Sequence, residues 1–546
     1  MRKHLLPILF IFFTALTIRL VPLLFSPLPY NIDGFPQARI TEEIMDTGRW
    51  YADGPIEDLE YNRKLPILPF YFVISSLVAG EEPLYFMQIA MVILTSLSAV
   101  LVYILAFKIT KSRVASIFAG LFMALCGTYV FLTASIMKQN IGLVLLPMVL
   151  YLYHERHNPK YRMLAAFLLL FMGLAHHLAT LIAFGMITLI MAAQNIADMK
   201  RGEWRWRSFL LDVLLGPALL LAVVAYYLAV QMPFFMDATD VNTIFLFMSV
   251  YFLVALLTIH LSSSSTLKPW FMTTKRSLPK YLDQKALFIL GAASLLVLNH
   301  FTSVFTGTIK TKGDFLILAI PSIMLVFVAL MGFNVMRRSE TRFRPLIAAG
   351  FMGPIAVMLF SFLWGLNPAS FVLLYRAYDY MDVALAVSIG IAFAVALRKP
   401  KSPVKKTVLA TFFLGLILLS TPLAYGSEDF FDVQNTTYLA EFKAMEHMDA
   451  HNMSNFGSDQ RLHATAGMYF DGMEGDGFLP IRLATGGDIS MYDYLLLESK
   501  WTTKGAQEHP LPSVVVENAI FLRTVREANL IYNSGPGETE IFLLAD

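Results

Sequence analysis

Long apolar runs separated by short polar segments fill the first 425 residues of the chain. A helix needs about 20 apolar residues to cross the hydrocarbon core of a bilayer. Roughly thirteen segments fit this requirement: 5–25, 84–107, 114–133, 139–153, 162–176, 178–195, 208–230, 242–262, 286–305, 315–336, 345–364, 378–397 and 405–424. The fourth and fifth are short, so the count holds to within about one. The pattern predicts a polytopic α-helical membrane protein with about 13 transmembrane helices.

Two apolar stretches need separate interpretation. The first, Leu5 to Phe25, is too long for a signal peptide and no small-residue cleavage site follows it, so we expect a retained first helix. The second, 66–80, is short and contains Pro66 and Pro69. We expect it to form a juxtamembrane helix that lies in the interface or re-enters the membrane.

Polar segments rich in Lys and Arg alternate along the chain with segments that are poor in them, and this asymmetry sets the orientation of a membrane protein. With the N-terminus inside, every inner segment is basic: 2–3, 108–113, 156–162, 200–207, 268–285, 337–344 and 398–406. The outer segments are acidic or nearly neutral: 26–65, 134–138, 176–177, 231–241, 306–314 and 365–377. This predicts an odd number of spans, with the C-terminus outside.

The overall composition agrees with this class of protein. The chain of 546 residues is 57% hydrophobic and 15% charged, whereas soluble domains have about 25% charged residues. Its net charge of +2 gives no reason to expect nucleic acid as a partner. Cys126 is the single cysteine and lies in an apolar run, which excludes an intrachain disulfide and disfavours a thiol nucleophile.

After residue 425 the composition changes to that of a soluble domain, so we expect a transmembrane domain over 1–425 and an extracytoplasmic α/β domain over 426–546. Periodicity predicts helices and strands in alternation within the second domain. The expected helices are 437–452 and 514–528, and the expected strands are 492–498, 529–533 and 538–544.

The first outer loop, 26–65, carries an acid, Asp33, close to the membrane surface. A carboxylate beside lipid loses part of its hydration, which makes it a stronger base. Asp33 could deprotonate an acceptor that attacks an anomeric carbon, or it could simply cap the helix that begins near Phe35. Glu42 and Glu43 are candidates for binding an acceptor or a divalent metal, with a solvated helix face as the alternative.

Several outer basic residues are candidates for binding a donor phosphate. Arg376 stands among aromatic residues before the twelfth run, and its planar fork suits a phosphate; an interfacial anchor or an ion pair with Asp379 is the alternative. Lys138, Lys310 and Lys312 lie on the side where cations are uncommon, as chance exceptions or as contacts for an anionic lipid head group. The remaining candidates are Tyr378, His176 and His177.

The two histidines leave several roles open: a phosphate contact, a proton relay, a metal ligand or a polar helix-to-helix turn. The chain has no Walker A loop and no HExxH sequence, which disfavours an ATP-driven pump and a zinc protease. Few charges lie inside the runs apart from residues near their ends, which weakens a transporter interpretation.

The chain resembles the GT-C superfamily of membrane glycosyltransferases, which includes protein O-mannosyltransferases, aminoarabinose transferases and the catalytic subunit of oligosaccharyltransferase. The resemblance rests on an early outer-loop acid (Ile32-Asp33-Gly34), a proline-containing apolar segment (Lys64 to Pro69), about thirteen spans, an Arg before a late span and an outer C-terminal domain. It implies that Asp33 is the catalytic base or an acceptor-binding carboxylate. It also implies a polyprenyl-phosphate sugar donor whose phosphate is held by basic residues, for which Arg376 and Lys138 match best.

The chain departs from the family pattern in three places. A WWDYG motif is missing, Gly34 replaces the second acid of the O-mannosyltransferase pair, and 134–140 contains no acid. Dependence on Mg²⁺ or Mn²⁺ is therefore left open. We expect a glycosyltransferase that acts on a glycan, lipid or protein acceptor at the outer face of the bilayer. A transporter or flippase of lipid-linked sugars and a non-catalytic membrane scaffold are the alternatives.

Overall fold

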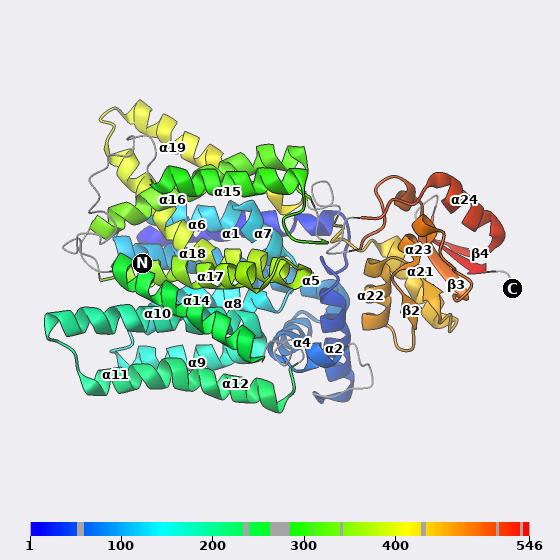
Figure 1. Ribbon diagram of the computed structural model, residues 1–546, viewed down its shortest axis with the longest axis horizontal. Helices are drawn as coiled ribbons and strands as arrows, with labels where there is room; N and C mark the ends of the chain where they lie inside the picture. The colour runs from blue at the N-terminus through cyan, green and yellow to red at the C-terminus, as the bar shows by residue number, and fades with distance from the viewer. Residues whose placement is uncertain are drawn as a thin grey trace.

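A computed structural model describes most of the chain: residues 2–51, 59–232, 240–262, 284–307, 310–338, 342–426, 433–508, 513–535 and 539–544. Three acids of the first outer loop, Asp53, Glu57 and Asp58, lie outside the described residues. The described part consists of a long helical bundle and a smaller region with a sheet at one end of it (Figure 1).

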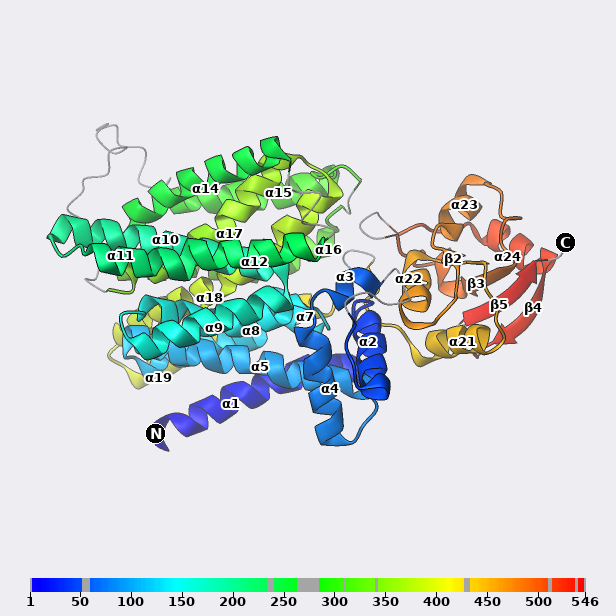
Figure 2. The same cartoon turned by 90° about the horizontal axis from the view of Figure 1, so that it is seen from below.

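The bundle contains helices whose axes run along its length (Figures 1 and 2). In its first half these are α1 (Arg2–Arg19), α5 (Pro83–Thr110), α6 (Arg113–Leu125), α7 (Gly127–Ala134), α8 (Gln139–His154), α9 (Pro159–Ala175) and α10 (His177–Arg201). The second half contains α11 (Trp206–Val213), α12 (Leu219–Ala229), α14 (Val241–Ser262), α15 (Gln284–Phe301), α16 (Gly313–Arg338), α17 (Arg344–Trp364), α18 (Pro368–Arg398) and α19 (Pro403–Leu418). A π-helical turn, Leu214–Ala218, joins α11 to α12.

Eight helices in the described ranges are long and apolar enough to cross a membrane, or nine if α6 and α7 together count as one bent span. Helices α1, α8, α9 and α15 lie in the same bundle but do not meet this length and composition criterion. The structure therefore confirms a bundle of apolar helices, and the count of about thirteen spans stays a prediction.

The predicted run 114–133 is broken into α6 and α7, which meet at Cys126 with a bend of 57°. The break follows from close packing, because a Cβ at Gly127 would come within 2.1 Å of the Ser420 carbonyl oxygen. The carbonyls that the break leaves free at the end of α6 accept hydrogen bonds from Arg19 and from Thr421. A bend inside a membrane helix needs such replacement partners.

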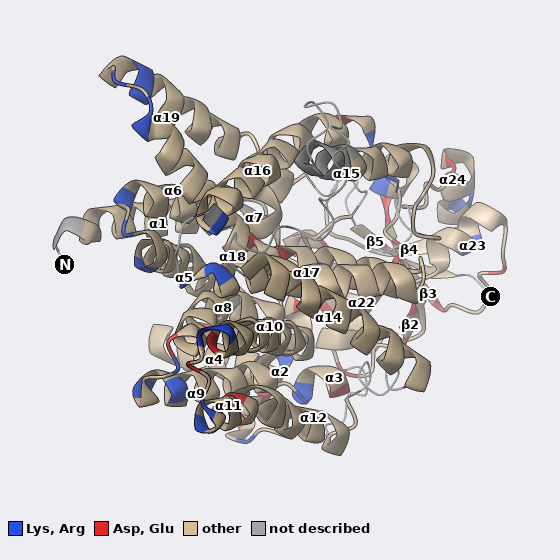
Figure 3. Cartoon of the chain, turned by 60° about the vertical axis from the view of Figure 1, so that its left-hand side comes forward, with Lys and Arg blue, Asp and Glu red and all other residues tan. Residues whose placement is uncertain are grey.

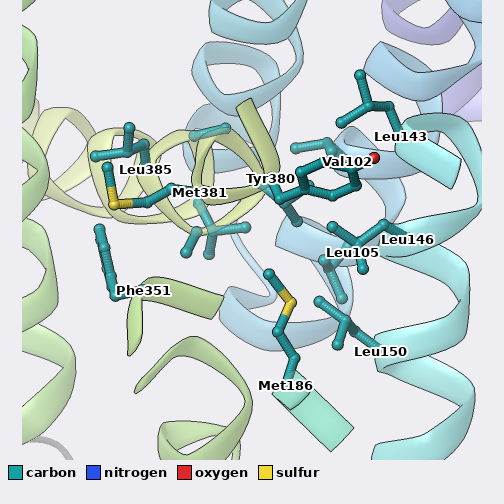
Figure 4. Packing of buried hydrophobic residues seen from close by; sticks show 14 of the residues in the cluster. Val102, Leu105, Leu143, Leu146, Leu150, Met186, Phe351, Tyr380, Met381 and Leu385 are labelled. Carbon is teal, nitrogen blue, oxygen red and sulfur yellow. The ribbon is translucent and has the colours of Figure 1, made fainter. Parts of the chain in front are cut away.

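The core of the bundle lies where α5, α8, α10, α17 and α18 meet. Figure 4 shows Val102 of α5, Leu143 of α8 and Tyr380 of α18 side by side in this core. Because α18 is buried along most of its length, its polar side chains face protein rather than lipid.

Three short helices lie at the end of the bundle near the sheet: α2 (Gly34–Thr47), α3 (Glu60–Arg63) and α4 (Ile67–Ala79). Helices α2 and α4 run across the direction of the bundle (Figure 2). The helix predicted for 66–80 is confirmed as α4, which exposes Ile74, Leu77 and Val78. Its position at a membrane surface stays a prediction.

The C-terminal region forms a five-stranded sheet in the order β2-β1-β3-β5-β4. The strands are β1 (Phe456–Gly457), β2 (Gly475–Asp476), β3 (Tyr494–Glu498), β4 (Ala528–Asn533) and β5 (Thr539–Leu544). Pairs β1–β2 and β1–β3 are parallel, and β3–β5 and β5–β4 are antiparallel. The helices are α21 (Leu439–Ala450), α22 (Gln460–Tyr469), α23 (Leu479–Thr485) and α24 (Asn518–Glu527). Helices α21 and α24 and strands β3, β4 and β5 fall within four residues of the predicted bounds.

Helix α2 joins the bundle to the C-terminal region. Arg39 forms an ion pair of 2.5 Å with Asp471, and Tyr469 donates a hydrogen bond of 3.0 Å to Glu42. Phe35 stacks on Phe442 with the ring centroids 5.9 Å apart. The position of α2 is therefore set by both parts of the molecule.

Lys and Arg gather at the end of the bundle away from the sheet (Figure 3). The turns between α5 and α6, α8 and α9, and α18 and α19 carry them, as expected for the inner segments. The described residues of the first outer loop and segment 135–138 lie at the other end, beside the C-terminal region. Which end faces the cytoplasm stays a prediction.

Candidate active site

The backbone before Asp33 is held by three parts of the molecule. The Tyr30 N–H donates to Gln88 Oε1 of α5 at 2.9 Å, and the Ile136 N–H donates to the Tyr30 carbonyl at 3.2 Å. The Asn31 N–H donates to the Asn435 carbonyl at 2.9 Å. A segment fixed in this way can position a reacting group without the flexibility of a free loop.

Asp33 occupies the position before α2, but its side chain makes no capping hydrogen bond within the described chain. Instead its own N–H donates to Asn31 Oδ1 at 3.1 Å, and Asn31 adopts φ +99°. The Asp33 side chain is partly exposed. Its carboxylate is therefore available for another partner, and side-chain capping does not account for it.

Lys138 lies in the segment between α7 and α8 and is only 9% exposed. Its Nζ donates to Asn62 Oδ1 at 2.8 Å and lies 3.5 Å from the centroid of the Tyr61 ring. Gln37 Nε2, one turn after Asp33 on α2, donates to the same Asn62 oxygen at 2.9 Å. Burial lowers the pKa of Lys138 to about 7, although the Asp33 carboxylate opposes this shift.

Arg376 of α18 completes the group. Its Nε is buried and has no hydrogen-bond partner among the described residues, and it interacts with Asp379 electrostatically without a hydrogen bond between the two in the described chain. The Asp33 carboxylate interacts electrostatically with Arg376, with Lys138 and with the Tyr61 phenol. We call Asp33, Tyr61, Asn62, Lys138 and Arg376 the Asp33 site. It places one carboxylate near the buried Lys138 and the partly buried Arg376. Neither cation has an acidic hydrogen-bond partner in the described chain, an arrangement suited to an anionic ligand.

The two predicted histidines border this site. His176 caps α10, and its Nδ1 accepts a hydrogen bond of 3.2 Å from the Ala179 N–H. His177 Nδ1 lies 3.3 Å from Tyr61 Oη. Burial holds the pKa of His176 well below its usual value, so this imidazole is neutral and carries its proton on Nε2. The two histidines thus lie at a polar turn between helices, as one of the predicted roles requires, and also beside Lys138 and Arg376.

Glu42 and Glu43 both have protein partners. Glu43 accepts hydrogen bonds of 3.0 and 2.5 Å from the buried Arg63, and Glu42 accepts one from Tyr469. Burial raises the pKa of Glu42 to about 7. No group of three His, Cys, Asp or Glu side chains suited to a metal occurs in the described part of the chain. A metal at Glu42 and Glu43 stays a prediction that these contacts do not favour.

Three other predicted phosphate-binding residues have different surroundings. Lys310 and Lys312 lie between α15 and α16. The Thr311 N–H between them donates to the Asn299 carbonyl, and Thr311 Oγ1 and its carbonyl accept from Asn299 Nδ2 and His300 Nδ1. Tyr378 interacts electrostatically with two acids of α18. The roles of these residues in phosphate binding stay predictions.

The sequence interpretation missed residues of two kinds. Tyr61, Asn62 and Gln37 contribute to the site through contacts that no local pattern signals. Asp379 and Asp382 lie on one face of α18, are 2% and 0% exposed, and have carboxylate oxygens with no hydrogen-bond partner in the described structure. Asp382 is therefore an ionisable group well inside a candidate span, contrary to the expectation that charges stay near the ends of the runs. An acid within an apolar run is itself a signal of function.

Known proteins resemble this chain in structure but not in sequence. No protein family and no curated protein matches the chain in sequence. The apo crystal structure of the oligosaccharyltransferase of Archaeoglobus fulgidus aligns with all of this chain and 75% of its own, at 14% identity and a TM-score of 0.54. The same archaeon's AglB, in complex with an inhibitory peptide and a dolichol-phosphate, aligns with 99% of this chain and 74% of its own, at 12% identity and a TM-score of 0.50.

The apo structure of ArnT from Cupriavidus metallidurans covers 98% of this chain and 97% of its own, at 12% identity and a TM-score of 0.39. The archaeal structures carry the fold assignment, because they span both the bundle and the C-terminal sheet of this chain. The chain thus has the fold of the archaeal oligosaccharyltransferase structures, and at the level of the fold this agrees with the resemblance seen in the sequence.

Proposed function

We propose that the protein transfers a sugar from a polyprenyl-phosphate-linked donor to an acceptor at the Asp33 site. The observation that carries this proposal is the electrostatic contact of Asp33 with the buried Lys138 and the partly buried Arg376, two cations that have no acidic hydrogen-bond partner in the described structure. Asp33 supplies one negative charge for these two cations, so the site can accept a further negatively charged group. A lipid phosphate supplies that charge.

The donor class follows from where the cations lie. They stand at the end of a bundle of apolar helices, where a phosphate on a long apolar chain can reach them while its chain stays in the bilayer. One structure with a similar fold holds a dolichol-phosphate. That likeness supports the same kind of donor here.

In the proposed reaction, the acceptor gives its proton to the Asp33 carboxylate as its oxygen or nitrogen attacks the anomeric carbon. The bond between that carbon and the phosphate oxygen breaks, and its electron pair stays on the phosphate. Lys138 and Arg376 stabilise this charge, each by a few kcal/mol. Because the attack is a direct displacement, the configuration at the anomeric carbon inverts.

The acceptor would enter from the side of the C-terminal region. Helix α2 carries Asp33 at its start and contacts Tyr469 and Asp471 of that region farther along. We propose that residues 426–546 form an extracytoplasmic domain that holds or selects a glycan, lipid or protein acceptor. The corresponding transmembrane domain would be 1–425, in a plasma membrane with the sheet outside.

The test uses the full-length chain in nanodiscs with a panel of polyprenyl-phosphate sugars, and measures release of polyprenyl phosphate. Asp33→Asn is expected to reduce the release at least about 100-fold while donor binding is kept. Asp46→Asn is the matched control, because Asp46 is exposed on the same helix. Equal activity of the two variants would refute a catalytic Asp33, whereas no release by the unmodified protein would refute the transferase and favour a non-catalytic scaffold.

A second candidate, a transporter of lipid-linked sugars, is favoured by the buried Asp379 and Asp382 and by the broken span α6–α7. Intramembrane acids and discontinuous helices are typical of transporters. Transport of a fluorescent lipid-linked sugar across proteoliposomes distinguishes the two. Loss of transport in Asp382→Asn, with no release of polyprenyl phosphate in the unmodified protein, would support the transporter.

A further inference from the structure

A cavity opens at the end of the bundle opposite the Asp33 site. Its volume is about 270 Å³, and three parts of the bundle line it. Ile109 ends α5 and Ser112 precedes α6, Val335 and Met336 belong to α16, and Ile391 and Arg398 belong to α18. No step of the proposed sugar transfer uses this cavity.

The wall of the cavity offers apolar contacts. Its aliphatic and Met side chains come from all three parts, and its two hydroxyl groups are already engaged in the helix ends. Thr110 Oγ1 donates to the Ala106 carbonyl at 2.7 Å, and Ser112 Oγ accepts from the Ala115 N–H at 3.3 Å. A polyhydroxylated ligand such as a sugar would find few partners there, whereas a hydrocarbon chain fits such a wall.

One of the residues that line the cavity, Arg398, is positively charged. Arg398, the last residue of α18, is exposed and forms no ion pair with an acid in the described ranges. The first turn of α6 also borders the cavity through Ser112 and Ala115, so the positive end of that helix dipole adds to the attraction for an anion. Lys399 and Lys401 follow Arg398 in the chain and keep this end of the bundle basic.

We propose that this cavity binds an anionic phospholipid of the surrounding bilayer, with part of an acyl chain against the apolar wall and the phosphate on Arg398. The cavity is slightly smaller than the roughly 300 Å³ at which small-molecule pockets begin, so it takes part of a chain rather than a whole lipid. Charge complementarity selects the anionic head group, as at other basic pockets between membrane helices. Because one lipid touches α6, α16 and α18 together, it holds these helices to one another.

The test needs no glycosyltransferase activity. The full-length protein in detergent is incubated with phosphatidylglycerol, with phosphatidylcholine or with glycerol phosphate, and native mass spectrometry and thermal unfolding report binding. We expect phosphatidylglycerol to be retained at least about fivefold more than phosphatidylcholine and to raise the Tm more. Glycerol phosphate alone should bind weakly, because it lacks the chain.

Two variants and one control locate the binding. Arg398→Gln should abolish the preference for phosphatidylglycerol, whereas the control Lys406→Gln removes another exposed charge, outside the cavity, and should keep the preference. Ala394→Leu narrows the cavity and should reduce retention of both lipids. The proposal is overturned if the two lipids bind equally to the unmodified protein, if both Gln variants behave alike, or if glycerol phosphate binds as well as the lipid.

Discussion

Lys138 allows the sharpest test of the Asp33 site. Two pH dependences of opposite sign, that of stability and that of donor affinity, should both disappear with one substitution. Burial lowers the pKa of Lys138 from 10.5 to about 7 in the folded protein. Asp33 and Arg376 are the charged groups that act on it, and Tyr61 and His177 lie beside it. The substitution is Lys138→Met, which keeps the length of the side chain and removes the charge.

The size of the effect follows from the two pKa values. Between pH 7 and 10.5 the unfolded chain binds the Lys138 proton and the folded chain does not, so the free energy of unfolding rises with pH by about 1.4 kcal/mol per unit. Below about pH 7 Lys138 is protonated in both the folded and the unfolded chain, so its contribution to the free energy of unfolding no longer changes with pH. Affinity for an anionic donor changes the other way. It falls up to about tenfold per pH unit above 7, since Lys138 must regain its proton when the anionic donor binds.

The assay measures donor binding and chemical unfolding of the full-length protein in detergent between pH 6 and 9. Lys138→Met should remove both slopes above pH 7, whereas Lys160→Met, an exposed lysine at the other end of the bundle, should keep them. If Lys138→Met kept the fall in donor affinity above pH 7, Lys138 would not be the group that binds the donor phosphate.

Three further predictions concern α2 and the segments beside it. Glu43→Gln leaves the buried Arg63 without a charged partner and should lower the free energy of unfolding by roughly 3 kcal/mol or more. Much of this loss should be recovered when Arg63→Met is added, and denaturant titration measures the stability of both variants. The pKa of Glu42, raised to about 7, makes stability fall as pH rises from about 4.5 to 7, and Glu42→Gln should flatten that fall in the same titration. Gly34→Ala brings a Cβ within 2.4 Å of Pro29 Cβ, so it should displace the neighbouring Asp33 carboxylate. Sugar transfer should fall by up to about 100-fold with donor binding unchanged, and an unchanged transfer rate would contradict this prediction.

Much of the helical architecture could be predicted because the signal is local. Apolar length alone indicates a membrane helix, and the alternation of apolar and polar residues indicates strands such as β3. The break at Cys126 could not be predicted, since it depends on the backbone of 420–424 packing against Gly127. The same limit applies to Glu42 and Glu43, whose partners Tyr469 and Arg63 are brought to them by the packing of other helices.

Local patterns in the chain were enough to specify an apolar helical bundle, a separate α/β region, and an acid and several cations as candidates for a phosphate-dependent reaction. Which of these candidates meet depends on the packing of the helices: Asp33, Lys138 and Arg376 come from segments far apart in the chain and share one electrostatic site. The protonation of Lys138 and the burial of Asp382 likewise depend on that packing. Proximity and desolvation arise only when the chain is folded, and a residue's chemistry depends on them as much as on its type.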